Sequence, residues 1–210
     1  MMIHGAVSKI SIHEESRHTT LPRFKITFIK NNIADAWKST KMERERSASS
    51  GLKDLKTFGG KMIEIRESLK EDMNECTNLF LKVFLGEPWN DKWESFDSAK
   101  DYLTEFIENP FFKGFIVCEN SRIIGVCFGH TRSYWQGKEF QIDEMYVDTE
   151  VQGKGVGTKL ICYVKDDLHK QGIKNFVLIA GKDLPAEKFY VKNGFYRNES
   201  IILMNYKANF

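Results

Sequence analysis

Proline and cysteine are scarce in this chain, long apolar runs are missing, and the charge is nearly balanced. Only 4 of the 210 residues are Pro and 15 are Gly, which excludes a collagen-like or low-complexity chain. Cys76, Cys118, Cys127 and Cys162 form no C-x-x-C pair, and we interpret them as reduced thiols of a cytoplasmic protein. No apolar run approaches the roughly 18 residues of a membrane span, so no membrane partner is expected.

The small net charge gives little support to nucleic-acid binding. The chain carries 31 Lys and Arg residues against 29 Asp and Glu residues, a net charge of +2. The basic excess lies in residues 1–60, whereas residues 61–210 are slightly acidic. A basic nucleic-acid arm is an alternative for the first segment, but that segment shows no interleaving of aromatic and basic side chains. We therefore do not expect a nucleic-acid partner.

The two parts of the chain differ in patterning. Residues 1–60 are interpreted as a basic, poorly patterned extension or linker, with a strand-like stretch at Phe24–Ile29 and a boundary at Gly59-Gly60. Residues 61–210 alternate apolar and polar positions with the periods of strands and helices. We assign them to one mixed α/β domain.

The patterns in residues 61–210 predict an antiparallel front half followed by a strand–helix–strand crossover. Ser68 and Glu71 are expected to form a capping box before an amphipathic helix, and a second helix should end at Asn109-Pro110. Phe176–Ala180 is continuously apolar, as expected for a strand buried on both faces. The other strands are expected at Met62–Arg66, Gly114–Cys118, Ile123–Arg132, Glu139–Val147, Phe195–Arg197 and Ile201–Tyr206, and further helices after Gly157 and at Ala186–Lys192.

The most informative segment is Gln152-Gly153-Lys154-Gly155-Val156-Gly157-Thr158, between an apolar strand and an amphipathic helix. The first N–H groups of a helix are unpaired and carry the positive end of its dipole, so they attract phosphate. Glycines allow close approach of the backbone, and Lys154 adds a cation. The segment therefore suits a diphosphate, although a glycine-rich helix start without a ligand is an alternative. Its spacing matches neither G-x-x-x-x-G-K-[ST] nor G-x-G-x-x-G.

Gln152 to Gly157 match Gln/Arg-x-x-Gly-x-Gly/Ala, which resembles the pyrophosphate-binding motif of the GNAT superfamily of acetyl-CoA-dependent N-acetyltransferases. The resemblance includes the preceding strand, Glu144–Val147, and Ala186–Phe195, which is similar to the family's A-x-x-F-Y-x-x-x-G-F ending. It covers roughly residues 62–207. It implies a mixed, mostly antiparallel sheet with a central parallel, splayed strand pair, flanked by helices.

The resemblance also implies that acetyl-CoA is bound as the acetyl donor, with the pantetheine arm between the splayed strands, and that no metal is needed. Asp183 stands where the family often has an Asn near the pantetheine. The residues that would contact the cofactor are Met145, Tyr146, Val147, Gln152, Gly153, Lys154, Gly155, Val156, Gly157, Thr158 and Asp183.

Catalytic roles follow from the same resemblance. Tyr190 is the family's usual proton donor to the departing thiolate, and a tyrosine packed beside Phe189 is the alternative. Asp143 and Glu144 are the candidates for the base. As neighbours on a strand they should face opposite sides of the sheet, with Asp143 on the face of Gln141, Met145 and Val147. We favour Asp143, because Ile142-Asp143-Glu144 resembles a segment of some aminoglycoside 6′-N-acetyltransferases. A rim carboxylate paired with a surface Lys is the alternative.

The acceptor is expected near Glu87–Glu108, where acidic side chains outnumber basic ones. Trp89, Asp91 and Trp93, together with Asp143, would suit a polycationic amine by charge and by stacking. A solvated helix face with two Trp side chains packed on the sheet is the alternative.

The sequence thus predicts an N-acetyltransferase that moves acetyl from acetyl-CoA to a primary amine in a ternary complex, first of all to a small cationic amine such as an aminoglycoside. Polyamines, amino-acid derivatives and protein N-termini are alternative acceptors, and a non-catalytic acyl-CoA-binding or regulatory module is an alternative function. The sequence leaves a homodimer open. It gives no role to the histidines, including His130, which is placed in the core or at the rim of the sheet.

Overall fold

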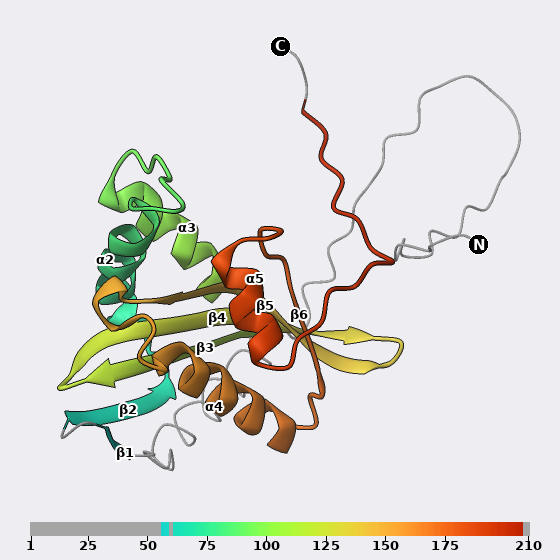
Figure 1. Ribbon diagram of the computed structural model, residues 1–210, viewed down its shortest axis with the longest axis horizontal. Coiled ribbons are helices and arrows are strands. Elements are labelled where there is room, and N and C mark those ends of the chain that lie inside the picture. Colours follow the sequence, from blue (N-terminus) through green and yellow to red (C-terminus); the bar gives the residue numbers. More distant parts are fainter. Residues whose placement is uncertain (1–55, 59–60, 208–210) are drawn as a thin grey trace, which may run out of the picture. The chain divides into compact units, whose positions relative to one another are not determined.

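The computed structural model of this protein describes residues 56–58 and 61–207 (Figure 1). The extension expected over residues 1–60, with its strand at Phe24–Ile29, lies outside these residues except for one short strand, β1 (Lys56–Phe58). β1 pairs antiparallel with the beginning of β2 (Lys61–Glu67), so the sheet includes residues before position 61.

The described residues form a sheet whose six strands follow one another in sequence order. β1 to β5 pair antiparallel, and β5 and β6 pair parallel. The remaining strands are β3 (Phe112–Glu119), β4 (Arg122–Tyr134), β5 (Gly137–Val147) and β6 (Asn175–Leu178). The expected mixed, mostly antiparallel sheet is confirmed.

Helices cover both faces of the sheet (Figure 1). α2 (Met73–Phe84) and α3 (Phe96–Glu108) bury Phe80 and Leu103 against a cluster that includes Ile116 and Phe128. On the other face, α4 (Val156–Lys170) and α5 (Pro185–Lys192) pack against a cluster around Phe115 and Phe140. We refer to these as the α3 face and the α4 face. Two short 3-10 helices, η1 (Lys70–Asp72) and η2 (Thr149–Val151), complete the described elements.

The start of the first helical segment differs from the expected capping box. The backbone N–H of Leu69 donates to the carboxylate of Asp72 over 2.6 Å, whereas the backbone N–H of Ser68 donates to Gly114 in the neighbouring strand over 2.9 Å. The helical turn therefore begins one residue later than predicted, because sheet pairing extends through Ser68. The carboxylate of Asp72 therefore caps this turn. The two terminal nitrogens of the Arg66 guanidinium donate to its two oxygens over 2.7 and 2.8 Å.

The C-terminal part differs more strongly from the sequence prediction. Phe195–Arg197 and Ile201–Tyr206 form no strand, and Figure 1 shows the segment after α5 as irregular coil. As a result β6 is an edge strand in the described part of the sheet, and its four residues are only half-buried. The parallel pair therefore lies at the edge of this sheet instead of its centre, and the expected burial of Phe176–Ala180 on both faces is wrong for this chain.

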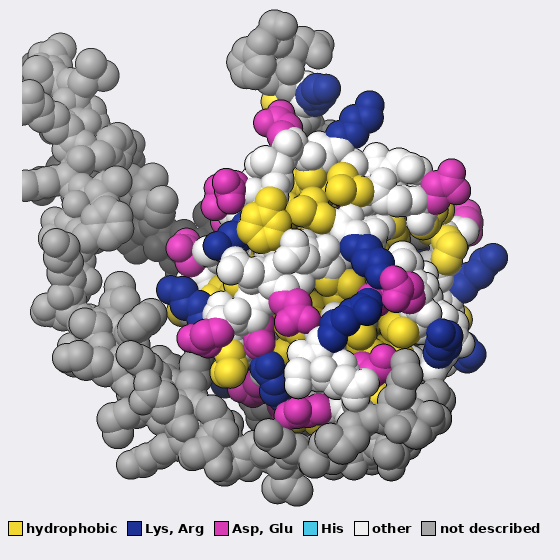
Figure 2. All heavy atoms as spheres, turned by 90° about the vertical axis from the view of Figure 1, so that its left-hand side faces the viewer, with side chains coloured by type: hydrophobic (Ala, Val, Ile, Leu, Met, Phe, Trp, Pro, Cys, Tyr) yellow, Lys and Arg dark blue, Asp and Glu magenta, His cyan; other side chains and the backbone are white. Residues whose placement is uncertain are grey.

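Within residues 56–58 and 61–207, no helix combines the length and the apolar composition that a membrane crossing requires. The surface seen in Figure 2, which is the left-hand side of Figure 1, carries Lys, Arg, Asp and Glu side chains interspersed.

Candidate active site

The glycine-rich segment, residues 152–158, follows β5 and η2 in the sequence, and its last residues form the start of α4. Gln152 to Gly155 are exposed, and Gly153 and Gly155 adopt positive φ angles of 73° and 81°. Nothing lies within 4 Å of the position that a Cβ would take at either glycine. The first amides of α4 have no intrahelical partner, so this exposed segment is suited to bind a diphosphate.

Gly157 has a different role in the same segment. A Cβ at Gly157 would lie 3.2 Å from the ring of Phe189 and 3.5 Å from a methyl group of Val147. Glycine at this position therefore allows α4 to start close to α5 and β5. The side chain of Val156 is in the core, so only its backbone faces the segment's surface.

An ion-pair cluster stabilises the backbone between β5 and this segment. The carboxylate of Asp148 is 1% exposed and accepts from Lys82 of α2 at 2.7 Å and from Arg122 of β4. Burial alone would raise the pKa of Asp148, but the bonds from Lys82, from the N–H of Glu150 and from Arg122 outweigh burial and lower the pKa. The side chain of Gln152 adds a hydrogen bond to the carbonyl of Val147 at 3.0 Å.

β5 and β6 diverge beside the glycine-rich segment. Their pairing ends at Ile142 opposite Leu178, although β5 continues to Val147. In the described sheet, the last five residues of β5 therefore have no strand next to them on the β6 side. This gap suits an extended ligand arm that bonds to the backbone as an added strand would. Together with the open amides of the glycine-rich segment, it fits the diphosphate and pantetheine parts of coenzyme A.

A β-bulge at Asp143 brings the two candidate bases to the same face. Phe128 pairs with Glu144 and Gly129 with Ile142, so Asp143 is the extra residue of β5. A bulge interrupts the alternation of side chains along a strand. Glu144 contacts Tyr102 of α3, and Asp143 lines a cavity with the same tyrosine. The expectation that these two carboxylates face opposite sides is therefore wrong.

The bulge also separates Asp143 from residues expected on its face. Met145 and Val147 pack against the α4 face, whereas Tyr146 is buried against the α3 face and donates its hydroxyl to the carbonyl of Cys76 at 3.1 Å. Of the residues predicted to share a face with Asp143, only Gln141 does so, and it donates to Asp143 over 3.2 Å. The side chain of Tyr146 points away from the gap between β5 and β6, and only its backbone is available there.

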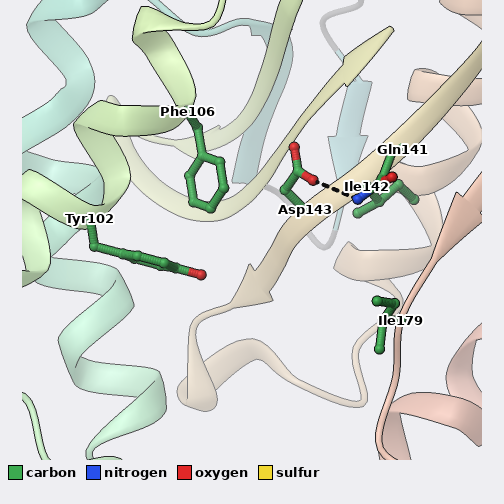
Figure 3. A pocket seen from close by; sticks show the side chains of 6 residues that line it. All are labelled: Tyr102, Phe106, Gln141, Ile142, Asp143 and Ile179. Atoms are coloured by element: carbon green, nitrogen blue, oxygen red, sulfur yellow. Dashed lines mark hydrogen bonds between the residues drawn. The ribbon is translucent and has the colours of Figure 1, made fainter. Parts of the chain in front are cut away.

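A cavity of about 220 Å³ opens between α3 and the end of the β5–β6 pair. Figure 3 shows Tyr102 and Phe106 reaching toward it from α3, across from Asp143 on β5 and Ile179 after β6. The remaining lining residues are Gln141 and Ile142. The cavity therefore has an aromatic wall and an acidic wall.

Both oxygens of the Asp143 carboxylate have partners. Nδ1 of His130, on β4, lies 2.6 Å from Oδ2 of Asp143, and Gln141 donates to Oδ1. The side chains of His130 and Asp143 are 23% and 11% exposed. The carboxylate is thus fixed in orientation.

Glu144 lies in a different environment. Burial raises the pKa of Glu144 to about 7, and the negative charges of Asp143 and Asp91 act in the same direction. The hydroxyl of Tyr102 donates to Oε1 of Glu144 over 2.5 Å and partly offsets this increase. A carboxylate with a pKa near neutrality is suited to accept a proton in a reaction at neutral pH.

Tyr190 of α5 packs its ring against Phe189 and Phe195, with ring centroids 5.2 and 5.4 Å away. Burial raises its pKa well above the usual tyrosine value, with smaller contributions from the charges of Cys127 and Glu144. Its hydroxyl therefore stays protonated at neutral pH. Among the described residues, no group forms a hydrogen bond with this hydroxyl.

None of the predicted acceptor residues in the loop between α2 and α3 lines the cavity. Trp89 packs against Phe84 at 5.6 Å, and Trp93 packs against Phe80 at 5.3 Å and Tyr102 at 5.1 Å. Neither Trp lines the cavity, and Nε1 of Trp93 is buried without a hydrogen-bond partner in the described structure. Asp91 is exposed and acts on Glu144 and Tyr102 by its charge.

Asp183 lies before α5 in a left-handed conformation, with a φ angle of 63°. Its backbone N–H donates to Glu187 over 2.6 Å, and its carboxylate lies 3.3 Å from Arg197. The side chain is 77% exposed and is engaged with this ion pair.

Three residues at the site were not identified from the sequence as site residues: His130, Tyr102 and Phe106. Tyr102 and Phe106 lie one helical turn apart on α3, the helix that the sequence predicts before Asn109-Pro110. His130 reaches Asp143 across the β4–β5 pairing, and the bulge that permits this contact leaves no signal in the sequence.

Comparisons with known proteins identify the family and the fold of this chain. The profile of the acetyltransferase (GNAT) family matches residues 67–195. An uncharacterized N-acetyltransferase from Methanocaldococcus jannaschii is 28% identical in an alignment of 150 positions that covers 67% of this chain and 64% of that protein. This chain therefore matches less than two thirds of that relative's length.

Two solved structures show the same fold. An aminoglycoside acetyltransferase from an uncultured soil metagenomic sample, in complex with sisomicin, is 20% identical with a TM-score of 0.56, covering 70% of this chain and 97% of its own. A predicted acetyltransferase from Clostridium acetobutylicum, solved with acetyl-CoA, is 19% identical with a TM-score of 0.54, covering 69% of this chain and 96% of its own. Because the family profile matches more than half of the chain, this protein belongs to the GNAT acetyltransferase family.

Proposed function

We propose that this protein transfers the acetyl group of acetyl-CoA to a primary amine of a small cationic acceptor, with an aminoglycoside as the first candidate. One observation carries the proposal. Asp143 and Glu144 lie on the same face of the sheet, close to a cavity whose opposite wall is formed by Tyr102 and Phe106. Two carboxylates and two aromatic rings favour a cationic ligand by charge and by cation–π attraction.

Acetyl-CoA would be held by the glycine-rich segment and by the gap beside β5. The amides of Val156, Gly157 and Thr158 would bind the diphosphate, with Lys154 as an added cation. Backbone groups of Met145 and Val147 would bond to the pantetheine arm. The family neighbour solved with acetyl-CoA supports this donor.

Glu144 is proposed as the general base. An amine attacks the thioester carbonyl only as the neutral species, so the proton of its ammonium form has to leave. Glu144 has a pKa of about 7 and can accept that proton near neutral pH. We prefer Glu144 to Asp143, because the two oxygens of Asp143 are already bonded to His130 and Gln141.

Tyr190 is proposed as the proton donor to the thiolate of coenzyme A. When the tetrahedral intermediate collapses, the carbon–sulfur bond breaks and the sulfur receives a proton. The hydroxyl of Tyr190 is protonated and has no hydrogen-bond partner among residues 56–58 and 61–207, so it is available for this transfer. The reaction is a direct transfer in a ternary complex, with no covalent enzyme intermediate.

Asp143 is proposed to bind and orient the acceptor. Its fixed carboxylate faces the cavity, where it would pair with an ammonium group of a polycationic molecule. The neighbour solved with sisomicin supports an aminoglycoside as the first acceptor to test. Polyamines, amino-acid derivatives and protein N-termini contain the same reactive group and are alternative acceptors.

A panel of amines tests this proposal. The purified protein is incubated with acetyl-CoA and each amine in turn, and released coenzyme A is measured with a thiol reagent. The panel contains aminoglycosides, polyamines, amino-acid amides and peptides with a free N-terminus, and reactions without an amine are the control. We expect the highest kcat/KM for polycationic amines. Preference for neutral or acidic acceptors would contradict the cationic site, and acetyl-CoA binding without turnover for any amine would favour a non-catalytic module.

A further inference from the structure

His130 contacts the acceptor side of the site, although no step of the proposed reaction uses it. The residue lies on β4, in register with Gln141 of β5, and its Nδ1 is 2.6 Å from Oδ2 of Asp143. Both side chains of this pair are mostly buried. In the part of the chain that the structure describes, no second hydrogen bond engages the ring. The polar contact of this imidazole is therefore with Asp143.

The contact depends on a close approach of β4 and β5 at Gly129. The register of the two strands shifts immediately before Gly129, where Asp143 is the extra residue of β5. A Cβ at Gly129 would lie 2.2 Å from the carbonyl oxygen of Gln141, which is a backbone atom and cannot move aside easily. A glycine inside a strand is typical of such a bulge. Gly129 therefore permits the register that places Asp143 beside His130.

The partner of Asp143 is a side chain that can donate without carrying a charge. A carboxylate only accepts hydrogen bonds, so Nδ1 of His130 carries the proton, and a neutral imidazole is sufficient for this bond. Within the described residues, no Lys or Arg side chain pairs with Asp143. Arg132, two positions along β4, donates to Glu139 instead. The negative charge of Asp143 is therefore left for a cationic ligand.

The bonded carboxylate still has room for a ligand. Its two oxygens offer about four lone-pair positions, and His130 and Gln141 use one position on each oxygen. Asp143 lines the cavity, and Figure 3 shows it across from Tyr102 and Phe106. An ammonium group in the cavity can therefore bond to the free positions without displacing either partner.

We propose that His130 is a positioning residue for acceptor binding. Its Nδ1 donates to Oδ2 of Asp143 and holds the carboxylate toward the cavity, while the neutral ring leaves the negative charge to an ammonium group of the acceptor. This inference rests on the proposed role of Asp143 and extends it to a residue that is not among those lining the cavity. Loss of His130 therefore lowers the affinity for the acceptor through Asp143, and it has little direct effect on proton transfer by Glu144 or Tyr190.

Two substitutions separate the hydrogen bond from the rest of the side chain. His130→Leu removes the donor and keeps an apolar side chain. His130→Asn keeps a neutral donor near Asp143, because the amide nitrogen of Asn is bonded to Cγ, as Nδ1 of histidine is. Thr131→Val is the matched control, since Thr131 is the next residue of β4 and is in register with Phe140 instead.

Sisomicin and spermine are the polycationic probes. Calorimetry in the presence of coenzyme A, which has no acetyl group to transfer, gives Kd for each probe, and the thiol-release assay with acetyl-CoA gives kcat. We expect His130→Leu to raise Kd about tenfold or more and to change kcat less than about threefold. His130→Asn should recover most of the affinity. An unchanged Kd in His130→Leu, or an equal loss of affinity in the two variants, would overturn the proposal.

A double-mutant cycle tests whether the effect passes through Asp143. The Kd of each probe is compared among His130→Leu, Asp143→Asn and the variant that combines them. If His130 acts by positioning Asp143, His130→Leu should raise Kd by less than about twofold once Asp143 is replaced, because residues that act as one unit are not additive. Effects that multiply would show that His130 acts independently of Asp143, as a residue needed only for the packing of β4 would, and would overturn the proposal.

The imidazole itself gives a readout that requires neither binding nor turnover. In protein with 15N-labelled histidine, the nitrogen chemical shifts distinguish the two neutral tautomers, and the signals that His130→Asn lacks belong to His130. We expect the proton on Nδ1 at pH 8, and a proton on Nε2 instead would overturn the proposal. Failure of the natural protein to bind either probe would also overturn it. Binding with the expected changes in Kd but without turnover of any amine would contradict the proposed acetyl transfer and support the role of His130.

Discussion

Asp143 and Glu144 are neighbours in the sequence, yet both side chains lie on the α3 face, because the β-bulge at Asp143 interrupts the alternation of β5. Their environments differ. Asp143 is bonded through both oxygens to His130 and Gln141, whereas Glu144 is bonded to Tyr102 and has a pKa of about 7. Two carboxylates with different partners can take two different roles in one site, one in binding and one in proton transfer.

Glu144→Gln should lower kcat about 100-fold or more, because it removes the proposed proton acceptor and keeps the shape of the side chain. Asp143→Asn is the matched control and should mainly raise the KM for the amine. Steady-state kinetics with the preferred acceptor measures both constants. A loss of kcat in Asp143→Asn together with a normal kcat in Glu144→Gln would show that Asp143 is the base and that Glu144 binds the amine.

Glu144→Gln should also be more stable than the natural protein at alkaline pH. The pKa of Glu144 is raised on folding. Between the ordinary pKa of Glu and about pH 7, its carboxyl is therefore protonated in the folded state and ionised in the unfolded state. Stability therefore falls as pH rises through this window, by up to about 3 kcal/mol. Glu144→Gln removes the penalty. Urea unfolding at pH 5 and pH 8 should show a gain at pH 8 alone, and an equal change at both values would contradict the raised pKa.

Tyr102→Phe should move the pH dependence of kcat/KM to higher pH. The hydroxyl of Tyr102 lowers the pKa of Glu144 by donating a hydrogen bond to its charged form. Without it, Glu144 stays protonated to a higher pH, so the acidic limb of the profile shifts upward. Phe106→Leu changes the same wall of the cavity without touching Glu144 and should leave the position of that limb unchanged.

Tyr190→Phe should lower kcat by about 10-fold or more and leave the dissociation constant for acetyl-CoA nearly unchanged, because the packing against Phe189 and Phe195 is kept. Calorimetry measures the affinity and the thiol-release assay measures the turnover. An unaffected turnover number would remove Tyr190 from the catalytic step.

Gly155→Asp should abolish acetyl-CoA binding, because it places a negative charge at the start of α4, where the diphosphate is expected. Gly155→Asn is the matched control: Asn also caps helices and tolerates the positive φ angle, but it is uncharged. Calorimetric titration with acetyl-CoA should show a much greater loss of affinity for Gly155→Asp than for Gly155→Asn. Equal affinity in the two variants would contradict a diphosphate at this position.

Asp148→Asn should weaken acetyl-CoA binding and destabilise the fold by about 2 kcal/mol, because Lys82 and Arg122 lose a buried partner at the entrance to the glycine-rich segment. Since the pKa of Asp148 is lowered in the folded protein, its contribution is present above the unfolded pKa and is lost as pH falls through the folded value. Glu150→Gln changes an exposed acid of the same cluster and should have a small effect. Thermal unfolding at pH 7 compares the two.

Most elements could be predicted from local pattern. The antiparallel strands β2 to β5 and the helices α2 to α5 are present near the predicted positions, because hydrophobic periodicity and helix-stop residues act over a few residues. The first capping box was placed one residue too early, since Ser68 pairs with Gly114, which is distant in the sequence. The strands predicted at 195–197 and 201–206 are not formed, although their apolar pattern is suited to pairing.

The candidate site was predictable only in part. The glycine-rich segment and Tyr190 stand in motifs whose residues are close in sequence, and the structure places the segment open at the start of α4. The contacts of His130 with Asp143 and of Tyr102 with Glu144 join residues from different elements. No local pattern indicates such contacts.

The sequence by itself determined the order of the strands and helices and the helix start that suits a diphosphate, because these depend on side chains and glycines within a few positions of one another. Only the tertiary structure decided that Asp143 lines the cavity and that Glu144 lies on the same face of the sheet. The register between β4 and β5 contains one extra residue at Asp143, and this bulge turns Asp143 and Glu144 to the same face. A register shift of this kind is set by long-range packing, which the order of residues along one strand does not reveal.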